Sequence, residues 1–394
     1  MREPLTFIRA FSLAATTALA LLSGAVGACG PMNDAPQGDG QSTRTITTSA
    51  ANEPDVGSET TREKSPSNRI EVEVLAKDLD VPWGVAFLPD GDALVTERDS
   101  GRLLRVSGDG KVEQVQRIPE DGSGEGGLLG LALSPDYEKD GLIYVYYSTG
   151  EDNRVGRFQL GEQPEPILTG IPVNTYHDGG GIAFGPDGML YVTTGDAGVP
   201  GNAQDRDSLS GKILRLTPDG TVPDDNPFPD SPTYSYGHRN VQGLAWDESG
   251  QLYVSEFGQD RFDEVNKIEA GGNYGWPEVE GAGGEPRFID PIQTFATDEA
   301  SPSGATILKD SAIPQWDGDF FMAALRGARL WRLELGPDGD VTGTEALLTG
   351  EYGRLRNAVQ APDGSLWIFT NNRDGRGTPT EGDDRILRLA PARG

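Results

Sequence analysis

The chain has 394 residues and a formal net charge of −29 at pH 7, from 62 acidic and 33 basic residues. This excess of negative charge argues against nucleic acid and against an anionic membrane surface as binding partners. The single cysteine, Cys29, excludes an internal disulfide bond, so stability must come from packing and from bound ions.

The first residues have the pattern of an export signal. Arg2 and Arg9 precede an apolar stretch, Phe11–Val26, that is too short and too rich in small residues to be a good membrane span. The stretch is followed by Gly-Ala and then Cys29, which resembles a bacterial lipobox, where the cysteine carries the lipid. We therefore predict a lipoprotein signal peptide over residues 1–28 and an exported protein, anchored by lipid to the outer face of the cell membrane. An ordinary cleaved signal peptide is the alternative.

Residues 29–68 differ in composition from the rest of the chain. Glycine, serine, threonine, proline, asparagine and acidic residues dominate, and large apolar residues are almost absent. Such a segment cannot bury enough surface to offset the entropy lost on ordering. We predict a disordered tether over residues 29–68, followed by a folded domain over residues 69–394 that is long enough for one large all-β domain.

The folded part repeats one sequence unit six times. Each unit has a short apolar strand, a polar turn that is most often Pro-Asp-Gly, and a second, alternating strand. The units begin at Trp83, Gly127, Gly180, Gln242, Ser303 and Asn357. Turn residues between strands of period two indicate hairpins, and a spacing of roughly 45 to 65 residues is typical of a β-propeller. We predict an all-β fold, a six-bladed β-propeller with four-stranded antiparallel blades. Seven blades or a sandwich are the alternatives, but the sequence has no seventh unit.

Long inserts follow the second strand of the third and fourth units and should build up one face of the propeller with loops, where functional residues concentrate. The two histidines, His177 and His238, lie in glycine-rich loops just before the inner strands of these units. Both imidazoles should therefore face the central channel at the same place in consecutive blades. A base near neutral pH beside Arg239 suits proton abstraction from a hydroxyl. Histidines that merely cap turns are the alternative.

Arginines occur at the expected ends of strands although the chain is acidic. Arg354 and Arg356 are two residues apart before the last inner strand, so on extended backbone their side chains share a face. With Arg239 they could surround an anion with several carboxylates, because guanidinium groups bind carboxylates in bidentate fashion. Arg329 is more simply explained as a solubilising surface residue.

The stretch from Tyr234 to Pro277, YSYGHRNVQGLAWDESGQLYVSEFGQDRFDEVNKIEAGGNYGWP, resembles the signature of the soluble sugar dehydrogenases that use pyrroloquinoline quinone (PQQ). This is the glucose/sorbosone dehydrogenase and aldose sugar dehydrogenase family. The likeness runs from about Val81 to Leu389 and includes GEGGLLGLALSPD, YHDGGGIAFGPDG and RLRNAVQAPDG in the same order. It implies an enzyme, a quinoprotein sugar dehydrogenase with PQQ and Ca²⁺ as cofactors, an aldose as substrate and an external electron acceptor.

The resemblance assigns roles to residues by their position. His177 falls on the family's catalytic base, Arg239 and Asn240 fall on its cofactor-binding Arg-Asn pair, and Tyr176 and Asp178 flank the base on the substrate side. It further implies that His177 takes the proton of the anomeric hydroxyl while hydride leaves the same carbon for the quinone. Arg239 would stabilise the negative charge on the quinone oxygen, and the product would be a lactone.

Four further residues fall on cofactor-binding positions of the family. Arg354 and Arg356 match the pair that holds the quinone carboxylates. Arg326 falls on a lysine, so the positive charge is kept while its geometry is not. Glu125 falls on a glutamine, which adds a negative charge near an anionic ligand.

Calcium is implied by the same resemblance. Gly258 and Gln259 fall on a Gly-Pro pair whose carbonyls bind the metal, and ligation by carbonyls depends on backbone rather than on the proline. Glu264 and the carbonyl of Tyr274 match a further calcium position. The ion would polarise a quinone carbonyl as a Lewis acid. Composition alone indicates only a solvated acidic loop here.

Two departures from the family bear on the sugar. Tyr176 replaces an acidic residue of the glucose-specific branch, and no tryptophan lies between Phe295 and Ser303, where that branch has a sugar-stacking aromatic residue. Both favour the branch that oxidises aldoses broadly. Two other functions stay open at this point: a calcium-dependent lactonase of the propeller type, and a carbohydrate-binding propeller without catalysis.

Overall fold

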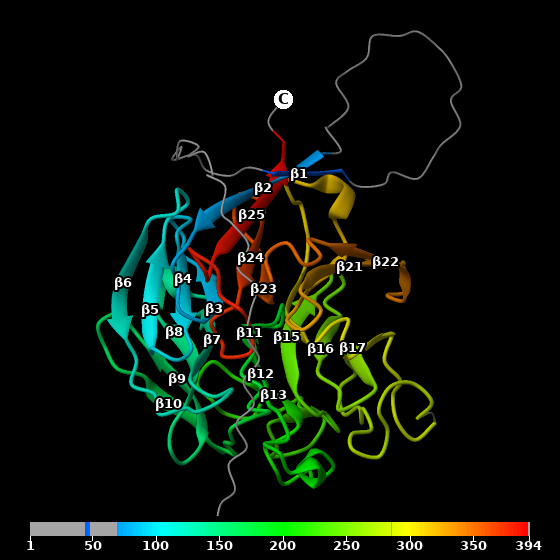
Figure 1. Ribbon diagram of the computed structural model, residues 1–394. Coiled ribbons are helices and arrows are strands. Elements are labelled where there is room, and N and C mark those ends of the chain that lie inside the picture. The colour runs from blue at the N-terminus through cyan, green and yellow to red at the C-terminus, as the bar shows by residue number, and fades with distance from the viewer. Residues whose placement is uncertain (1–43, 48–68, 285, 393–394) are drawn as a thin grey trace, which may run out of the picture. The chain divides into compact units, whose positions relative to one another are not determined.

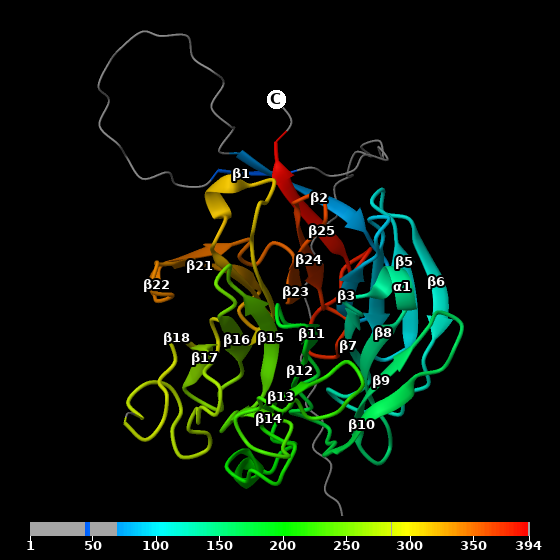
Figure 2. The ribbon, with the colours of Figure 1, turned by 180° about the vertical axis from the view of Figure 1, so that it is seen from behind.

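The computed structural model describes residues 44–47, 69–284 and 286–392. Almost all the regular structure in these residues is β-strand, gathered into six antiparallel sheets around a common axis (Figures 1 and 2). The prediction of an all-β, six-bladed propeller is confirmed. No helix in this part of the chain is long and apolar enough to span a membrane.

Five blades are each built from four consecutive strands, innermost first. The first blade contains β3 (Pro82–Phe87), β4 (Ala93–Glu97), β5 (Arg102–Val106) and β6 (Val112–Arg117). The second contains β7 (Leu128–Leu133), β8 (Ile143–Ser148), β9 (Asn153–Phe158) and β10 (Glu165–Ile171). The third contains β11 (Ile182–Phe184), β12 (Leu190–Thr193), β13 (Lys212–Leu216) and β14 (Thr233–Tyr236). The fourth contains β15 (Val241–Trp246), β16 (Leu252–Glu256), β17 (Phe262–Lys267) and β18 (Gln293–Ala296). The fifth contains β19 (Pro302–Ile307), β20 (Phe320–Ala324), β21 (Arg329–Leu335) and β22 (Val341–Leu347). Helical structure in the described residues is confined to α1 (Tyr137–Asp140) and to short 3-10 turns at Pro200–Ala203 and Pro314–Trp316.

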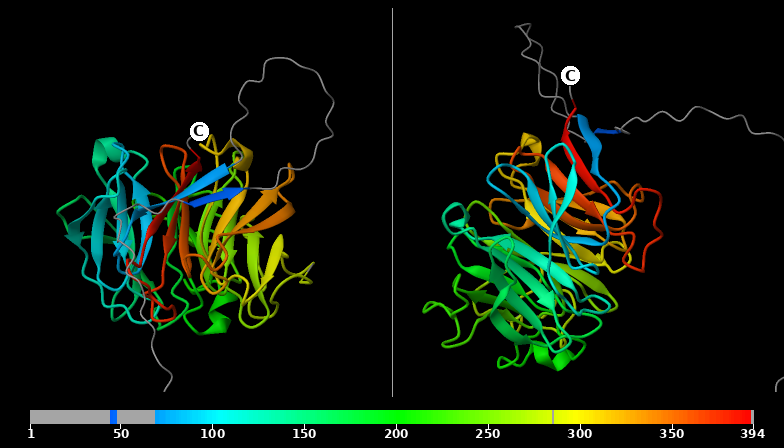
Figure 3. Two further views of the ribbon diagram at one scale, coloured as in Figure 1. Left: turned by 45° about the horizontal axis from the view of Figure 1, so that its top comes forward. Right: turned by 90° about the vertical axis from the view of Figure 1, so that its left-hand side faces the viewer.

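The sixth blade joins the two ends of the described chain. Its order is β1-β2-β25-β24-β23, with β1 (Arg44–Thr47), β2 (Arg69–Ala76), β23 (Leu355–Gln360), β24 (Leu366–Thr370) and β25 (Ile386–Pro391). The N-terminal β2 pairs with the C-terminal β25, which closes the ring (Figure 3). β1 adds a fifth strand, so the predicted tether of residues 29–68 contains a strand. The rest of that segment lies outside the described residues, as do the predicted signal peptide and Cys29.

The six inner strands all begin at one face of the propeller. In each blade the first residue of the inner strand lies opposite the end of the second strand, as Pro82 lies opposite Glu97 and Leu355 opposite Thr370. We call the face where inner strands begin and second strands end the mouth face. Loops before the inner strands and after the second strands therefore meet there.

Glycines near the start of the inner strands let neighbouring blades approach closely. A Cβ atom on Gly84 would lie 2.6 Å from the carbonyl oxygen of Leu129, and one on Gly243 would lie 2.7 Å from that of Ser303. Ser255, on the next strand outward, donates a 2.5 Å hydrogen bond to the same Ser303 carbonyl. The apolar clusters fill the space between adjacent sheets. They do not fill the propeller axis, where a channel remains between the six inner strands.

One prediction about the inserts is wrong. The long insert of the third blade follows its second strand as expected, between Thr193 and Lys212, but that of the fourth blade follows the third strand, between Lys267 and Gln293. The reason is that β17, which sequence analysis had counted with the insert, pairs with β16 as a regular strand. The fourth-blade insert nevertheless reaches the mouth face, where its Trp276 contacts the loop after β12.

Candidate active site

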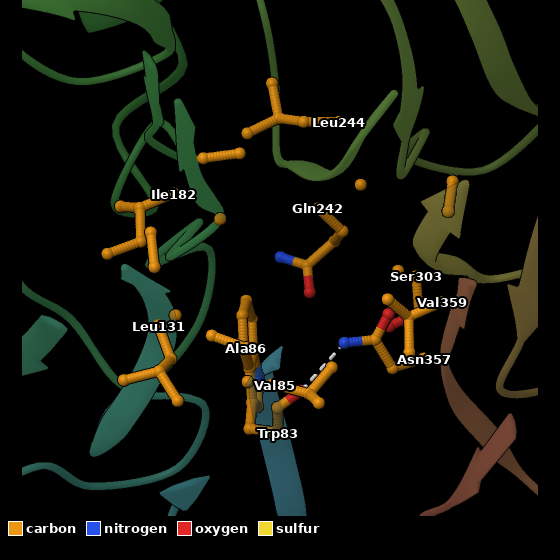
Figure 4. A pocket seen from close by; sticks show the side chains of 18 of the residues that line it. Trp83, Val85, Ala86, Leu131, Ile182, Gln242, Leu244, Ser303, Asn357 and Val359 are labelled. Carbon is orange, nitrogen blue, oxygen red and sulfur yellow. Dashed lines mark hydrogen bonds between the residues drawn. The ribbon is translucent and has the colours of Figure 1, made fainter. Parts of the chain in front are cut away.

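A channel with a volume of about 350 Å³ lies on the axis and is lined by all six inner strands. Figure 4 shows its lining, which is apolar at Leu131, Ile182 and Val359 and polar at Gln242 and Ser303. The polar side chains come from the first residues of the inner strands, so the polar end of the channel is the end nearer the mouth face.

Arg356 closes the polar end of the channel. Its side chain is buried, donates from one terminal nitrogen to Gln242 Oε1 and Ser303 Oγ at 3.0 Å each, and stands 5.6 Å above the Trp83 ring. Its Nε is buried and has no partner within the described residues, and no carboxylate there forms an ion pair with it. Burial, and then the charge of Arg98, lowers the pKa of Arg356 to about 9, so the group is still charged at neutral pH.

Two further arginines stand near Arg356. Arg354 donates to Asp374 Oδ2 at 3.0 and 2.7 Å, and the buried Arg98 is paired with the adjacent Asp99. Both positive charges lower the pKa of Arg356. We call Arg98, Arg354 and Arg356 the arginine cluster. Sequence analysis missed Arg98, whose one signal is its place directly after a second strand.

The arginine cluster fits a ligand with several carboxylates. A buried guanidinium with an unused N–H and like charges beside it is costly in isolation, and an anion that accepts its hydrogen bond removes that cost. PQQ carries such carboxylates, so the residues at the mouth suit the cofactor that the sequence implies. Arg326 lies on the turn between β20 and β21 at the same face, with an exposed side chain.

His177 has the geometry of a general base. Its Nδ1 lies 2.7 Å from Asp196 Oδ1, while no hydrogen bond in the described part of the chain engages its Nε2. Burial would raise the pKa of Asp196, but its hydrogen bonds with His177 and with Trp276 Nε1 outweigh burial and the pKa falls below its ordinary value. The ionised Asp196 accepts a hydrogen bond from Nδ1–H, which leaves Nε2 free to accept a proton. The backbone of His177 has a left-handed conformation, with φ of 62°, so the chain direction changes at this residue.

Arg239 lies on the other side of the same tryptophan. Its guanidinium stands 5.4 Å over the Trp276 ring and donates to Gln259 Oε1 at 2.8 and 3.1 Å. No carboxylate lies within ion-pair distance of this guanidinium among the described residues. Burial lowers the pKa of Arg239, and the charge of Asp196 is the largest effect that opposes this. Sequence analysis missed Asp196 and Trp276, because an aspartate after a strand and a tryptophan before a proline are ordinary turn residues in sequence.

Backbone contacts hold the two catalytic loops together. The Asp196 amide donates to the Arg239 carbonyl at 2.8 Å, and the Gly179 amide donates to Asn240 Oδ1 at 3.0 Å. Asn240 is buried, so within the structure it fixes the loop that carries His177. The structure thus brings His177, Arg239 and Asn240 together as predicted, and their roles stay predictions.

Glu125 links the imidazole loop to the last blade. Its Oε2 accepts the backbone N–H of His177 at 2.8 Å, and its Oε1 accepts from Arg376 at 2.8 Å. Burial would raise the pKa of Glu125, but these two contacts outweigh burial and lower the pKa. The negative charge of Glu125 also acts to raise the pKa of Arg239 and of Arg356.

The two predicted substrate residues have different surroundings. Tyr176 is 43% exposed, and its ring meets the His177 imidazole edge-on at 4.8 Å, which suits contact with a sugar at the mouth. Asp178 is 2% exposed and accepts hydrogen bonds from Asn153 and Asn174, and its Oδ2 is buried without a partner. Burial raises the pKa of Asp178 to about 6. Its side chain therefore lies inside the fold rather than on the exposed side of the loop.

The loop after β16, which carries the predicted calcium ligands Gly258 and Gln259, is held by one carboxylate. The four consecutive amides of residues 259–262 all donate to Glu280 Oε1, at 2.7 to 3.2 Å. The carbonyls of Gly258 and Gln259 accept no hydrogen bond from the described residues, which leaves their oxygens available to a hard cation. Among the described residues, no group of three or more His, Cys, Asp or Glu side chains is arranged to hold a metal ion.

The second predicted calcium position is more enclosed. Both carboxylate oxygens of Glu264 already accept hydrogen bonds, from Gly281 and Asn266. Burial and the neighbouring Glu256 raise the pKa of Glu264 to about 8. Tyr274 is buried, and its hydroxyl donates to the Lys267 carbonyl.

His238 does not share the position of His177, contrary to the expectation that both imidazoles face the channel. It is fully buried, with Nε2 2.8 Å from Ser235 Oγ and Nδ1 2.8 Å from Glu256 Oε2, and its ring stacks on Tyr274. The other oxygen of Glu256 accepts the amide of Arg239 at 2.5 Å. His238 therefore supports the Arg239 backbone from within.

The chain is similar to several known proteins. A family model described as Glucose / Sorbosone dehydrogenase matches residues 79–387. Aldose sugar dehydrogenase YliI of Escherichia coli is 31% identical over 78% of this chain and 91% of its own, and quinoprotein glucose dehydrogenase B of Acinetobacter calcoaceticus is 28% identical over 78% and 87%. The PQQ-bound aldose sugar dehydrogenase of Streptomyces coelicolor is 49% identical, with a TM-score of 0.76 over 83% of this chain and 99% of that one.

Proposed function

The chain belongs to the glucose/sorbosone dehydrogenase family and is a quinoprotein sugar oxidoreductase, and from this premise we propose that it oxidises the anomeric carbon of aldoses to lactones, with PQQ and Ca²⁺ as cofactors. The observation that carries the proposal is the convergence of a histidine and an arginine cluster at one end of a channel. His177 is oriented by an ionised aspartate, and Arg356 is a buried cation without a carboxylate partner among the described residues.

Different residues at the mouth bind the two cofactors. Arg354 and Arg356 bind carboxylates of the quinone, and the carbonyls of Gly258 and Gln259 hold the calcium ion. When bound, the quinone supplies the acceptor for the hydride and calcium supplies Lewis acidity.

His177 does the proton chemistry. Its Nε2 takes the proton of the anomeric hydroxyl, and Asp196 stabilises the imidazolium that results. Arg239 places a fixed positive charge where negative charge develops, with its side chain held by Gln259 and Trp276. Because these groups are held before the sugar arrives, little reorganisation accompanies the reaction.

The substrate is an aldose of broad identity. The exposed ring of Tyr176 offers an apolar face and a hydroxyl to a pyranose, in place of a carboxylate that would select particular hydroxyls. The enzyme is exported and held by a lipid at Cys29 on the outer face of the cell membrane, where electrons pass to an external acceptor.

Reconstitution tests this function. The purified protein is incubated with PQQ and Ca²⁺, and reduction of a redox dye is followed with a panel of aldoses. We expect dye reduction that requires both cofactors, and a change in the absorbance of the bound quinone when sugar is added. Failure to retain PQQ, or no reaction with any aldose, would contradict the proposal. Hydrolysis of lactones without quinone would favour the lactonase instead.

A further inference from the structure

Glu125 poses an electrostatic problem at the mouth. Its carboxylate acts on both Arg239 and Arg356, two guanidinium groups at the mouth that form no ion pair with a carboxylate among the described residues. If these arginines bind an anionic quinone, as the proposed function requires, a second negative charge stands close to that anion. Two like charges at this range repel, and the repulsion is strong where water is partly excluded.

Arg376 meets this charge from the sixth blade. Its guanidinium donates to Glu125 Oε1 at 2.8 Å across 251 positions of sequence. The side chain of Arg376 is 57% exposed, whereas that of Glu125 is 25% exposed. The pair thus lies at the surface end of the site and bridges the second blade to the sixth.

The loop after β24 holds Arg376 in place. Asp374 Oδ1 accepts hydrogen bonds from the backbone N–H of Arg376 at 2.9 Å and of Gly377 at 3.2 Å. Asp374 Oδ2 accepts hydrogen bonds from Nε and Nη2 of Arg354. One carboxylate therefore fixes a member of the arginine cluster and the backbone of Arg376 together. The position of Arg376 is set by the same loop that sets Arg354.

We propose that Arg376 is a positioning residue of the cofactor site, which compensates the charge of Glu125 and keeps its carboxylate on the His177 amide. The inference rests on the proposed function, because it supposes an anionic cofactor at the arginines. The Glu125–Arg376 pair has no net charge and offers a hydrogen-bond acceptor to the His177 amide. A neutral glutamine side chain at position 125 would provide the same acceptor.

This inference predicts a particular pattern of cofactor affinity. Arg376→Gln leaves the carboxylate uncompensated and weakens PQQ binding by about 10- to 100-fold at pH 8. Glu125→Gln removes the negative charge and preserves an acceptor for the His177 amide, so its affinity does not fall below that of the parent. The double variant Glu125→Gln/Arg376→Gln then recovers most of the affinity that Arg376→Gln loses, because no charge is left to compensate.

The pH dependence supplies a second signature. In the parent protein the pKa of Glu125 is lowered, so its charge is constant from pH 6 to 8. Without Arg376 two of the contributions that lower the pKa are lost while burial still raises it, so the carboxyl takes up a proton as the pH falls. The charged or titratable groups that act on Glu125 are Arg239, Arg356, Arg376, His177 and Asp178. Four of these five groups are present both in Arg376→Gln and in the double variant. Their titration therefore affects the PQQ affinity of both variants equally and drops out when the two affinities are compared.

Equilibrium dialysis of PQQ against the full-length, PQQ-free protein in Ca²⁺ buffer measures these affinities at pH 8 and pH 5. We expect the deficit of Arg376→Gln to shrink at pH 5 and to be absent from the double variant at both values. Arg388→Gln, which removes an ion pair with Asp363 in the same blade, is the matched control and should bind as the parent does. Thermal unfolding of each variant checks that all are folded.

Two results separate the inference from the function on which it rests. A parent protein that retains no PQQ overturns the proposed function and the inference with it. A parent that binds PQQ, with Arg376→Gln binding equally well or with no recovery in the double variant, overturns the inference alone.

Discussion

Replacing Arg356 by methionine should separate cofactor binding from stability. In the protein alone, Arg356 carries a buried Nε without a partner and stands near two like charges, so the native state bears a cost of about 1–3 kcal/mol for the unpaired donor. The substitution removes that cost but also loses two hydrogen bonds, to Gln242 and Ser303, whose oxygens line the channel and can bind water instead. We expect the free energy of unfolding to change by no more than about 1 kcal/mol, in either direction.

The same substitution should weaken PQQ binding severely. A buried guanidinium that binds a carboxylate is worth about 2–4 kcal/mol, so the dissociation constant should rise roughly 30- to 1000-fold. Urea denaturation of the cofactor-free protein and equilibrium dialysis of PQQ measure the two quantities. A large loss of PQQ affinity with little change in the free energy of unfolding would show that Arg356 serves cofactor binding rather than stability.

Arg215→Met provides the matched control. Arg215 is as buried as Arg356, but it is paired with Asp187 and Asp225 and also donates to Asn226. Its loss should destabilise the fold by about 2–3 kcal/mol and leave PQQ affinity unchanged. If Arg356→Met proved as destabilising as Arg215→Met, or bound PQQ with parental affinity, the assignment of Arg356 to the cofactor would be refuted.

Three other predictions follow from single residues. His177→Ala should retain PQQ and lower the turnover of aldoses by roughly two to four decades, and steady-state dye reduction with normal turnover would remove His177 from the mechanism. Asp178 has a pKa of about 6, so in the native state it is protonated between about pH 4 and 6 while in the unfolded chain it is ionised. Stability therefore falls by about 2 kcal/mol as the pH rises through this window, and Asp178→Asn should abolish that fall in urea denaturation at pH 4 and pH 7. Cys29→Ser should abolish metabolic labelling with a radioactive fatty acid and release the protein from the membrane fraction; labelling that persisted would show that the anchor lies elsewhere.

Much of the fold was predictable from local signals. Turn sequences between alternating strands recur six times. Turn type and strand alternation each depend on a few neighbouring residues, so the number of blades could be predicted from the sequence. The fourth blade shows the limit of this reading. Its third strand, Phe262–Lys267, has charged residues at half of its positions, so nothing local marked it as a strand, and the insert was placed one strand too early.

The candidate site was predictable only in part. Positions at or shortly before the start of the inner strands identified His177, Arg239, Arg354 and Arg356, because the start of an inner strand faces the axis in any propeller. His238 occupies the same place in sequence but is buried, since Ser235 and Glu256 enclose it from its own blade. Sequence position could not distinguish an imidazole at the mouth from one inside the blade.

The sequence by itself determined the six blades and the face on which the chemistry-bearing residues gather. Only the tertiary structure decided the partners of those residues: Asp196 for His177, Trp276 for Arg239, and Arg376 for Glu125. The physical reason is the closure of the ring. Strand patterns arise within one blade, whereas the contacts around the axis join loops from different blades, whose spacing exists only after β2 has paired with β25.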